Sequence, residues 1–280
     1  MSVSTLRPAP PAAAATASAP ATRVRAGLPM PVAQALVLVG LVAVWQLVDT
    51  IGVVSEQALS GPVEVSRALV GLLTTSAVWT EIGQTLTGWS IGLGVATAIA
   101  IPLGMLLGAS SPAYRSSRFV IDFLRTIPAL GIIPLASLLY GSTRSTELLI
   151  VVPACLWPLL LQTIYGVRDV DPVALESARS FRLGRGRTLT RVVLPSATPF
   201  IATGLRIAAV IGMLLAISVE LLVRVPGVGN GLARAQGNAA TDDVYAYTVI
   251  AGVMGLVVVL AFARIERALI HWHPSQRKTS

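Results

Sequence analysis

One polar loop carries the residues of this chain that are best suited to bind a partner. The stretch from Glu176 to Pro195 holds five arginines and lies between two long apolar segments. A basic loop between two membrane spans is expected in the cytoplasm, and this loop is longer and more patterned than an ordinary turn. The sequence therefore predicts that a cytoplasmic partner binds it. The arginines are Arg179, Arg182, Arg185, Arg187 and Arg191.

Two ionisable residues, Arg206 and Glu220, lie in an otherwise apolar stretch. Their spacing corresponds to about 21 Å along a straight helix, so they cannot pair with each other there. Charges inside a membrane are by default candidates for function. We expect Arg206 either to face an anion pathway or to tie its span to Asp122 or to backbone carbonyls. Glu220 is expected near the outer end of its span, where it could snorkel or contact an outer partner.

Membrane spans are the elements that must position these residues. The chain has 280 residues, of which 54% are hydrophobic and 12% are charged, with a mean hydropathy of +0.75. A soluble domain usually carries about twice that charged fraction, and a helix needs about 20 residues to cross the hydrocarbon core. We predict an all-α membrane protein with six transmembrane helices, the first and third short or tilted. The predicted spans are 31–48, 82–111, 126–143, 148–167, 192–219 and 244–263.

The distribution of Lys and Arg predicts the orientation. With the N-terminus inside, 16 of these residues fall in cytoplasmic segments and 4 in outer segments. This asymmetry indicates that both termini are cytoplasmic, in a multi-pass protein of the cell (inner) membrane. Topology and anionic membrane lipid account for the net charge of +8. No nucleic-acid partner is needed to explain it.

The sequence divides into one membrane domain and two tails. Residues 1–28 are rich in Ala, Pro, Ser and Thr and are expected to form a disordered cytoplasmic tail. Residues 29–268 form the predicted transmembrane domain, with a cytoplasmic loop at 168–195, and residues 269–280 form a second cytoplasmic tail. The single cysteine, Cys155, allows no intramolecular disulfide and is expected to be a small buried residue.

Proline and glycine residues mark the third predicted span. Pro128 and Pro134 flank Gly131, shortly after Arg125. Two prolines in a helix leave backbone carbonyls free and permit a kink. Broken membrane helices often line a transport pathway, so Arg125, Pro128 and Pro134 are pathway candidates. A purely structural kink is an equal alternative.

Glycines recur elsewhere with helical spacing. Gly88 with Gly92, and Gly104 with Gly108, share a face of the second span. This face is predicted to pack within the subunit, with a homodimer contact as the alternative. Residues 223–238 are also glycine-rich, and they contain no phosphate-loop lysine. We expect a flexible or re-entrant outer loop there.

The arginine-rich loop itself predicts two short helices. Asp171 can cap a helix and Pro172 suits its first turn. The small residues Ser177 and Ala178 allow a partner to approach closely, and Gly184 can end the helix. A second short helix at 188–193 would then lead to Leu194 and Pro195 at the membrane. The alternative is a solvated basic loop whose charge serves topology alone.

This pattern resembles a known family. Glu176-Ser177-Ala178, followed by Leu194-Pro195, is similar to the E-A-A loop of inner-membrane permease subunits of binding-protein-dependent ABC importers. Four further stretches resemble the nitrate/sulfonate/taurine branch of that family. Two departures stand out: Ser177 replaces an alanine, and Arg182 stands where the motif usually has glycine. The four stretches are "RTIPALGIIPLASLLYG", "GVRDVDPVALESARS", "LPSATPFIATGLRIA" and "VPGVGNGL".

The resemblance implies a fold and a set of partners. The fold would be the type I ABC importer permease (MetI-like) fold, working as a homodimer. A cytoplasmic ABC ATP-binding subunit would dock on the loop, and an extracytoplasmic solute-binding protein would deliver a small solute such as a sulfonate, taurine or nitrate. The implied coupling residues are Asp171, Pro172, Glu176, Ser177, Ala178, Arg179, Arg182, Gly184, Leu194 and Pro195.

Other functions remain open at this level. The chain has one lysine and no G-x-x-x-x-G-K-[ST] motif, so ATP hydrolysis would come from a partner, and no enzyme activity or cofactor is predicted. A channel or proton-coupled secondary transporter would need acidic residues or histidines in several spans, and only Glu220 is evident. A membrane scaffold for a cytoplasmic enzyme would use the basic loop without transport.

Overall fold

A computed structural model describes residues 30–52 and 58–269 of the chain. Both predicted tails lie almost wholly outside these ranges. Within them the chain is helical and has no strand. The long helices are α1 (Met30–Ile51), α3 (Ser76–Ala109), α6 (Arg144–Arg168), α9 (Leu194–Val223) and α11 (Thr241–Leu269). The shorter ones are α2 (Pro62–Leu73), α4 (Ser111–Leu124), α5 (Ile133–Tyr140), α7 (Pro172–Ser180), α8 (Arg185–Thr188) and α10 (Val228–Gly237).

These helices confirm the prediction of six spans. Five helical stretches are long and apolar enough to cross a membrane, and a bent pair, α4 with the segment Ala129–Tyr140, makes a sixth. The first stretch, α1, belongs up to Val44 to a separate unit. The second span begins at Ser76, earlier than the sequence suggested, and much of the segment before it forms the helix α2.

The third span is bent rather than a single kinked helix. The axis of the second arm is bent by 67° from that of the first. The first arm ends at Leu124, and a 3₁₀ turn, Ala129–Ile132, leads into α5. The break has a local cause, because Pro128 disfavours the helical conformation at the residue before it. Pro134 lies in the first turn of α5, where a proline is tolerated.

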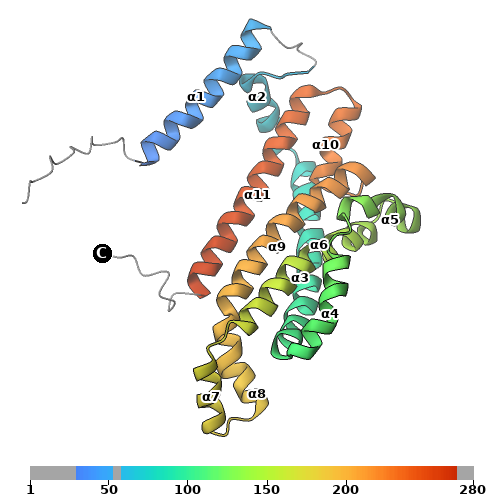
Figure 1. Ribbon diagram of the computed structural model, residues 1–280. Helices are drawn as coiled ribbons and strands as arrows, with labels where there is room; N and C mark the ends of the chain where they lie inside the picture. The colour runs from blue at the N-terminus through green and yellow to red at the C-terminus, as the bar shows by residue number, and fades with distance from the viewer. Residues whose placement is uncertain (1–29, 53–57, 270–280) are drawn as a thin grey trace, which may run out of the picture. The chain divides into compact units, whose positions relative to one another are not determined.

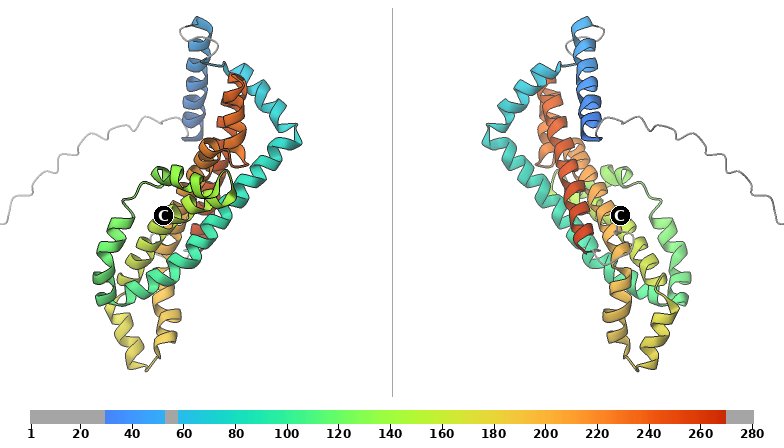
Figure 2. Two further views of the ribbon diagram at one scale, coloured as in Figure 1. Left: turned by 90° about the vertical axis from the view of Figure 1, so that its right-hand side faces the viewer. Right: turned by 90° about the vertical axis from the view of Figure 1, so that its left-hand side faces the viewer.

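The core is formed by α3, α6 and α9, which lie side by side (Figures 1 and 2). The glycines of α3 allow this close approach. A Cβ on Gly92 would lie 2.7 Å from Val151, and one on Gly108 would lie 2.7 Å from Val167, both on α6. The face shared by these glycines thus packs within the subunit, as predicted, and the homodimer alternative for it is wrong. Cys155 is buried in this core, also as predicted.

The two ends of the helical bundle carry different structures. At one end α7 and α8 form the turn that projects furthest, and α10 lies near the other end (Figure 1). α10 packs against α9, α11 and α3. Of the two alternatives for 223–238, the flexible loop is wrong, because most of that segment is a packed helix with Val228, Gly229 and Gly231 buried. The re-entrant alternative stays a prediction.

Candidate functional sites: a basic elbow and a buried carboxylate cluster

Residues 171–195, here called the elbow, begin with a well-formed helix. Asp171 is the N-cap of α7, and its Oδ1 accepts a hydrogen bond of 2.8 Å from the Val173 N–H. Pro172 takes the first helical position, where its missing N–H costs nothing. Both assignments agree with the sequence prediction. They fix the start of α7 directly after the C-terminus of α6.

Arg182 turns the chain between α7 and α8. The N–H of Arg182 donates to the Arg179 carbonyl (2.8 Å) and the N–H of Leu183 donates to the Ala178 carbonyl (3.0 Å). These two bonds form a Schellman motif, which requires a left-handed residue after the helix. Arg182 takes that position with φ of 51°. Glycine is the usual residue there because it has no Cβ, and this explains the glycine of the family motif.

Arg182→Gly should therefore stabilise the turn. A non-glycine residue in the left-handed region costs about 1 kcal/mol, and glycine removes that cost. We expect the Leu183 amide to exchange with solvent roughly five-fold more slowly, which corresponds to about 1 kcal/mol. Native-state hydrogen exchange of the detergent-solubilised protein measures this. Faster exchange in the variant would contradict the left-handed geometry.

The second half of the elbow runs without a break into the membrane span. Gly184 is the N-cap of α8, and α8 continues through a π-helical turn, Leu189–Val193, into α9. Pro195 explains the wide turn, since it has no N–H to donate and its ring crowds the preceding turn. The predicted separate helix at 188–193 is therefore part of one continuous helix. Leu194 is half-buried there, whereas Pro195 is exposed.

One face of the elbow is available to a partner. Glu176, Ser177 and Arg179 are exposed, whereas Ala178 is buried and cannot meet a partner as expected. Leu175 and Leu189 pack beneath the elbow against a small cluster that contains Val170 and Val193. Within residues 30–52 and 58–269, no carboxylate lies within ion-pair distance of the five elbow arginines. The elbow thus presents unpaired positive charge on a fixed scaffold.

Arg206 joins two spans, with a partner other than the expected one. Its Nη1 lies 2.8 Å from Glu266 Oε2 on α11. Thr203 Oγ1 donates to the other oxygen of the same carboxylate (3.2 Å). Asp122 instead pairs with Arg118 and Arg125 on its own segment. Arg206 therefore ties α9 to α11, which favours the structural interpretation over the anion pathway.

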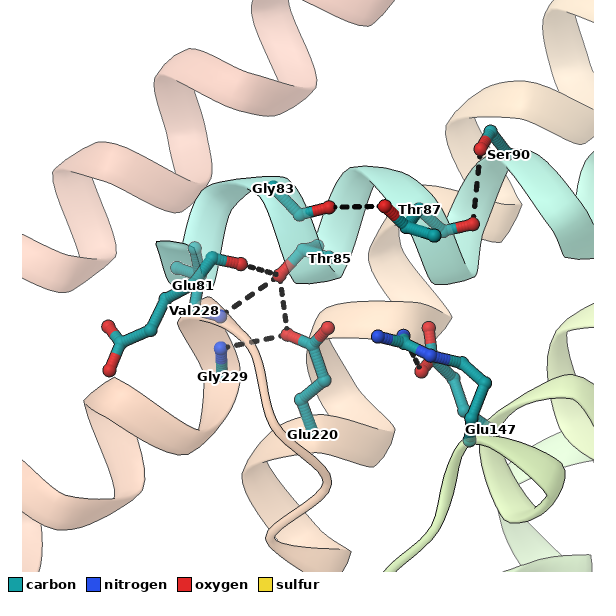
Figure 3. A network of polar contacts seen from close by, with 10 residues as sticks. Glu81, Gly83, Thr85, Thr87, Ser90, Glu147, Glu220, Val228 and Gly229 are labelled. Atoms are coloured by element: carbon teal, nitrogen blue, oxygen red, sulfur yellow. Dashed lines mark hydrogen bonds and ion pairs between the residues drawn. The ribbon is translucent and has the colours of Figure 1, made fainter. Parts of the chain in front are cut away.

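Glu220 is fully buried, so the prediction that it snorkels is wrong. Figure 3 shows its carboxylate between Thr85 of α3 and the start of α10. Its Oε2 accepts hydrogen bonds from Thr85 Oγ1 (2.9 Å) and from the Gly229 N–H (3.0 Å). Thr85 Oγ1 in turn accepts from the Val228 N–H (2.9 Å). A carboxylate is stabilised at a helix N-terminus, so Glu220 anchors α10 to α9 and α3.

The glycine spacing of the segment 227–231 follows from this anchor. A Cβ on Gly227 would overlap the Glu220 carboxylate. A Cβ on Gly229 would overlap the Ile217 carbonyl oxygen, and one on Gly231 would overlap the Tyr247 ring. At Gly229 the overlapped atom belongs to the backbone of α9, whereas at Gly227 and Gly231 the overlapped atoms belong to packed side chains, so a larger residue at any of the three would displace a neighbour. The glycine-rich sequence was therefore informative, but it indicated close packing of the segment 227–231 rather than mobility.

Two further carboxylates lie at the same end of the bundle and were missed by sequence reasoning. Glu81 accepts hydrogen bonds from Arg234 and from Tyr247 Oη (2.8 Å for the tyrosine). Glu147 is completely buried and pairs with Arg144. In the part of the chain that the structure describes, Glu147 Oε1 and Glu220 Oε1 are the buried side-chain oxygens without a hydrogen-bond partner. Glu81 and Glu220 together join α3, α9, α10 and α11 at this end, whereas the Glu147–Arg144 pair lies within α6.

Comparison with known proteins supports one family. A family model described as "Binding-protein-dependent transport system inner membrane component" matches residues 100–271. The taurine transport system permease protein TauC of Escherichia coli (strain K12) is 27% identical over 238 residues, which cover 83% of this chain and 86% of that protein. SsuC of the same strain, a candidate aliphatic sulfonates transport permease protein, is 30% identical over 239 residues, covering 85% and 90%.

A solved structure supports the fold. A chain of the MetNI methionine ABC transporter, in inward-facing conformations, matches with a TM-score of 0.59 at 18% identity, covering 72% of this chain and 97% of that chain. The sequence matches confirm the resemblance to ABC importer permeases of the nitrate, sulfonate and taurine branch. Since the family match spans more than half of its length, this chain belongs to the binding-protein-dependent transport system inner membrane components.

Proposed function

We propose that this chain is the membrane-spanning permease subunit of an ABC importer and that its elbow couples it to a cytoplasmic ATP-binding subunit. Residues 29–268 would form the permease domain, with the coupling loop at 168–195. The observation that carries the proposal is the elbow: a rigid turn of two helices at one end of the bundle, continuous with α9 through a π-helical turn. Movement of the elbow would therefore be transmitted directly to a span in the core.

The charge distribution supports a cytoplasmic location for the elbow. Most Lys and Arg residues fall on the side of the elbow in the six-span topology, and in that orientation both termini would be cytoplasmic. The chain lacks a phosphate-loop lysine. The ATP-binding subunit would supply hydrolysis, and two copies of this permease in the lipid bilayer would enclose the pathway. No cofactor takes part in this scheme.

The proposed cargo is a small anion, with a sulfonate or taurine first and nitrate next. The names of the similar permeases support this class. A solute-binding protein would deliver the anion at the end of the bundle that carries α10, opposite the elbow. Arg125, Pro128 and Pro134 at the bend of the third span remain pathway candidates, because exposed residues there break the span beside a charged side chain.

Proton-coupled secondary transport has more support from the structure than from the sequence, but it remains the weaker proposal. Glu81, Glu147 and Glu220 are all buried. A proton relay needs such groups spaced across the membrane. Here all three lie near one end, since Glu147 is in the first turn of α6, Glu220 is in the last turn of α9, and Glu81 is in the second turn of α3. Glu81 and Glu220 also bond neighbouring helices, and Glu147 pairs with Arg144 of its own helix.

Glu176→Arg tests the coupling role. The Glu176 side chain is exposed on α7 and has no packing function, so its charge reversal should leave insertion and folding intact. We expect complex formation with the ATP-binding subunit and ATP-dependent uptake to fall at least ten-fold, the size of a lost contact of about 1.4 kcal/mol. Co-purification and uptake into proteoliposomes measure both.

The matched control is Glu64→Arg, which makes the same charge change on an exposed residue of α2, outside the elbow. It should leave complex formation at the level of the unmodified protein. Normal ATP-driven uptake by the Glu176→Arg variant would rule out the elbow as the coupling element. Uptake by the unmodified permease without any ATP-binding subunit would instead favour secondary transport.

A further inference from the structure

A largely exposed aromatic side chain lies in the turn of the elbow between α7 and α8. Phe181 is the C-cap of α7 and is 81% exposed. The exposed apolar residues of the spans have lipid to cover them, but the turn between α7 and α8 lies at the extreme end of the bundle (Figure 1). A single exposed apolar side chain needs no explanation by itself, but aromatic residues next to arginines are the combination that protein interfaces favour. Buried aromatic anchors of this kind dominate the affinity of many interfaces.

Positive charge surrounds this aromatic residue. Arg179 and Arg182 flank it in sequence, and Arg185 begins the next helix. In the described ranges none of these guanidinium groups has a carboxylate within ion-pair distance. Free arginines on a fixed backbone suit the recognition of carboxylates, because the planar fork binds both oxygens.

Arg182 occupies the one position of the turn that favours glycine. Its φ of 51° is unfavourable for a residue with a Cβ, and the Schellman bonds hold it there. An arginine at this position makes the turn less stable and gains nothing inside the subunit, where it has no ion-pair partner among the described residues. A contact outside the chain would account for its presence.

We propose that Phe181 and Arg182 together form the anchor by which the elbow binds its ATP-binding subunit, and that the partner presents an apolar socket bordered by carboxylates. This inference rests on the proposed function and adds the chemistry of the partner surface. Phe181 would fill the socket, and the arginines would pair with the carboxylates at its edge. A protein partner fits better than anionic lipid, because the turn between α7 and α8 lies at the extreme end of the bundle, away from the long core helices that lipid surrounds (Figure 1).

Arg182→Gly separates the two roles of this residue. The variant improves the turn and removes the guanidinium, so a purely structural residue would leave binding unchanged or strengthen it. We expect the affinity of the full-length permease, in nanodiscs, for the purified ATP-binding subunit to fall several-fold. The salt dependence of binding should also weaken, since surface ion pairs are screened by salt. Phe181→Ser should lower the affinity at least ten-fold.

Arg115→Gly is the matched control, because Arg115 is an exposed arginine on α4, outside the elbow. It should bind the ATP-binding subunit like the unmodified permease.

Unchanged affinity in both Phe181→Ser and Arg182→Gly, with binding still lost in Glu176→Arg, would overturn the anchor and leave the proposed function standing. Effects seen only in nanodiscs of anionic lipid, and absent in zwitterionic ones, would assign the residues to lipid and overturn it too. Failure of the unmodified permease to bind any ATP-binding subunit while it transports would refute the proposed function itself.

Discussion

Gly229→Ala is expected to displace α10 and to lower strongly the stability and the recovery of folded protein in detergent. A Cβ at this position would overlap the Ile217 carbonyl oxygen and lie 2.7 Å from the Leu221 nitrogen. Both are backbone atoms of α9, so they cannot rotate away, and α10 must move instead. Overpacking of this kind costs about 1–3 kcal/mol. The displaced Gly229 N–H also leaves the buried Glu220 carboxylate, which costs about another 1–3 kcal/mol.

Gly252→Ala provides the matched control for this prediction. A Cβ on Gly252 of α11 meets no atom within 4 Å, and alanine is more favourable than glycine in a helix by about 0.5–1 kcal/mol. The thermal unfolding midpoint and the monodisperse fraction after solubilisation should fall sharply for Gly229→Ala and stay level or rise for Gly252→Ala. A midpoint for Gly229→Ala equal to that of the unmodified protein would show that α10 does not contact α9 as described.

Sequence reasoning succeeded where the determining physics is local or compositional. Apolar blocks near the length of a span predicted six crossings because the bilayer sets that length. Asp171 and Pro172 predicted the start of α7 because capping depends only on the first turn of a helix. The third span was placed too late, since residues 111–124 contain charged residues and yet form its first arm.

The buried carboxylates could not be predicted in the same way. Glu81 and Glu147 lie directly before the apolar blocks at 82–111 and 148–167, where acidic residues normally flank a span in contact with water. Tertiary packing buries them: α10 folds back and brings Arg234 to Glu81, and Gly88 lets Arg144 and Glu147 approach α3. Hydropathy patterns carry no information about a helix that returns to cover the ends of its neighbours.

The two ends of the bundle therefore differ in the kind of contacts that hold them in place. The elbow is held by local bonds, the Asp171 cap and the Schellman turn, and leaves its charges free for a partner. The opposite end is held by long-range bonds, in which α3, α9, α10 and α11 share buried acidic groups. A displacement of the elbow would therefore move α9 as one helix. It would move α10 as well, because Glu220 of α9 is hydrogen-bonded to the start of α10.

Arg144→Met should have the second large effect, because it removes the cation from a completely buried carboxylate. The side chain of Glu147 has no exposed surface and pairs with Arg144. Breaking a buried ion pair on one side costs about 3–5 kcal/mol, since the remaining charge is uncompensated.

Arg118→Met is the control, because the Arg118–Asp122 pair is exposed and such pairs contribute about 0–1 kcal/mol. We expect a large fall in the unfolding midpoint for Arg144→Met alone, with partial recovery when Glu147→Gln is added. Equal, small falls in the unfolding midpoint for both single variants would show that water reaches the Glu147 carboxylate and that its environment is not buried.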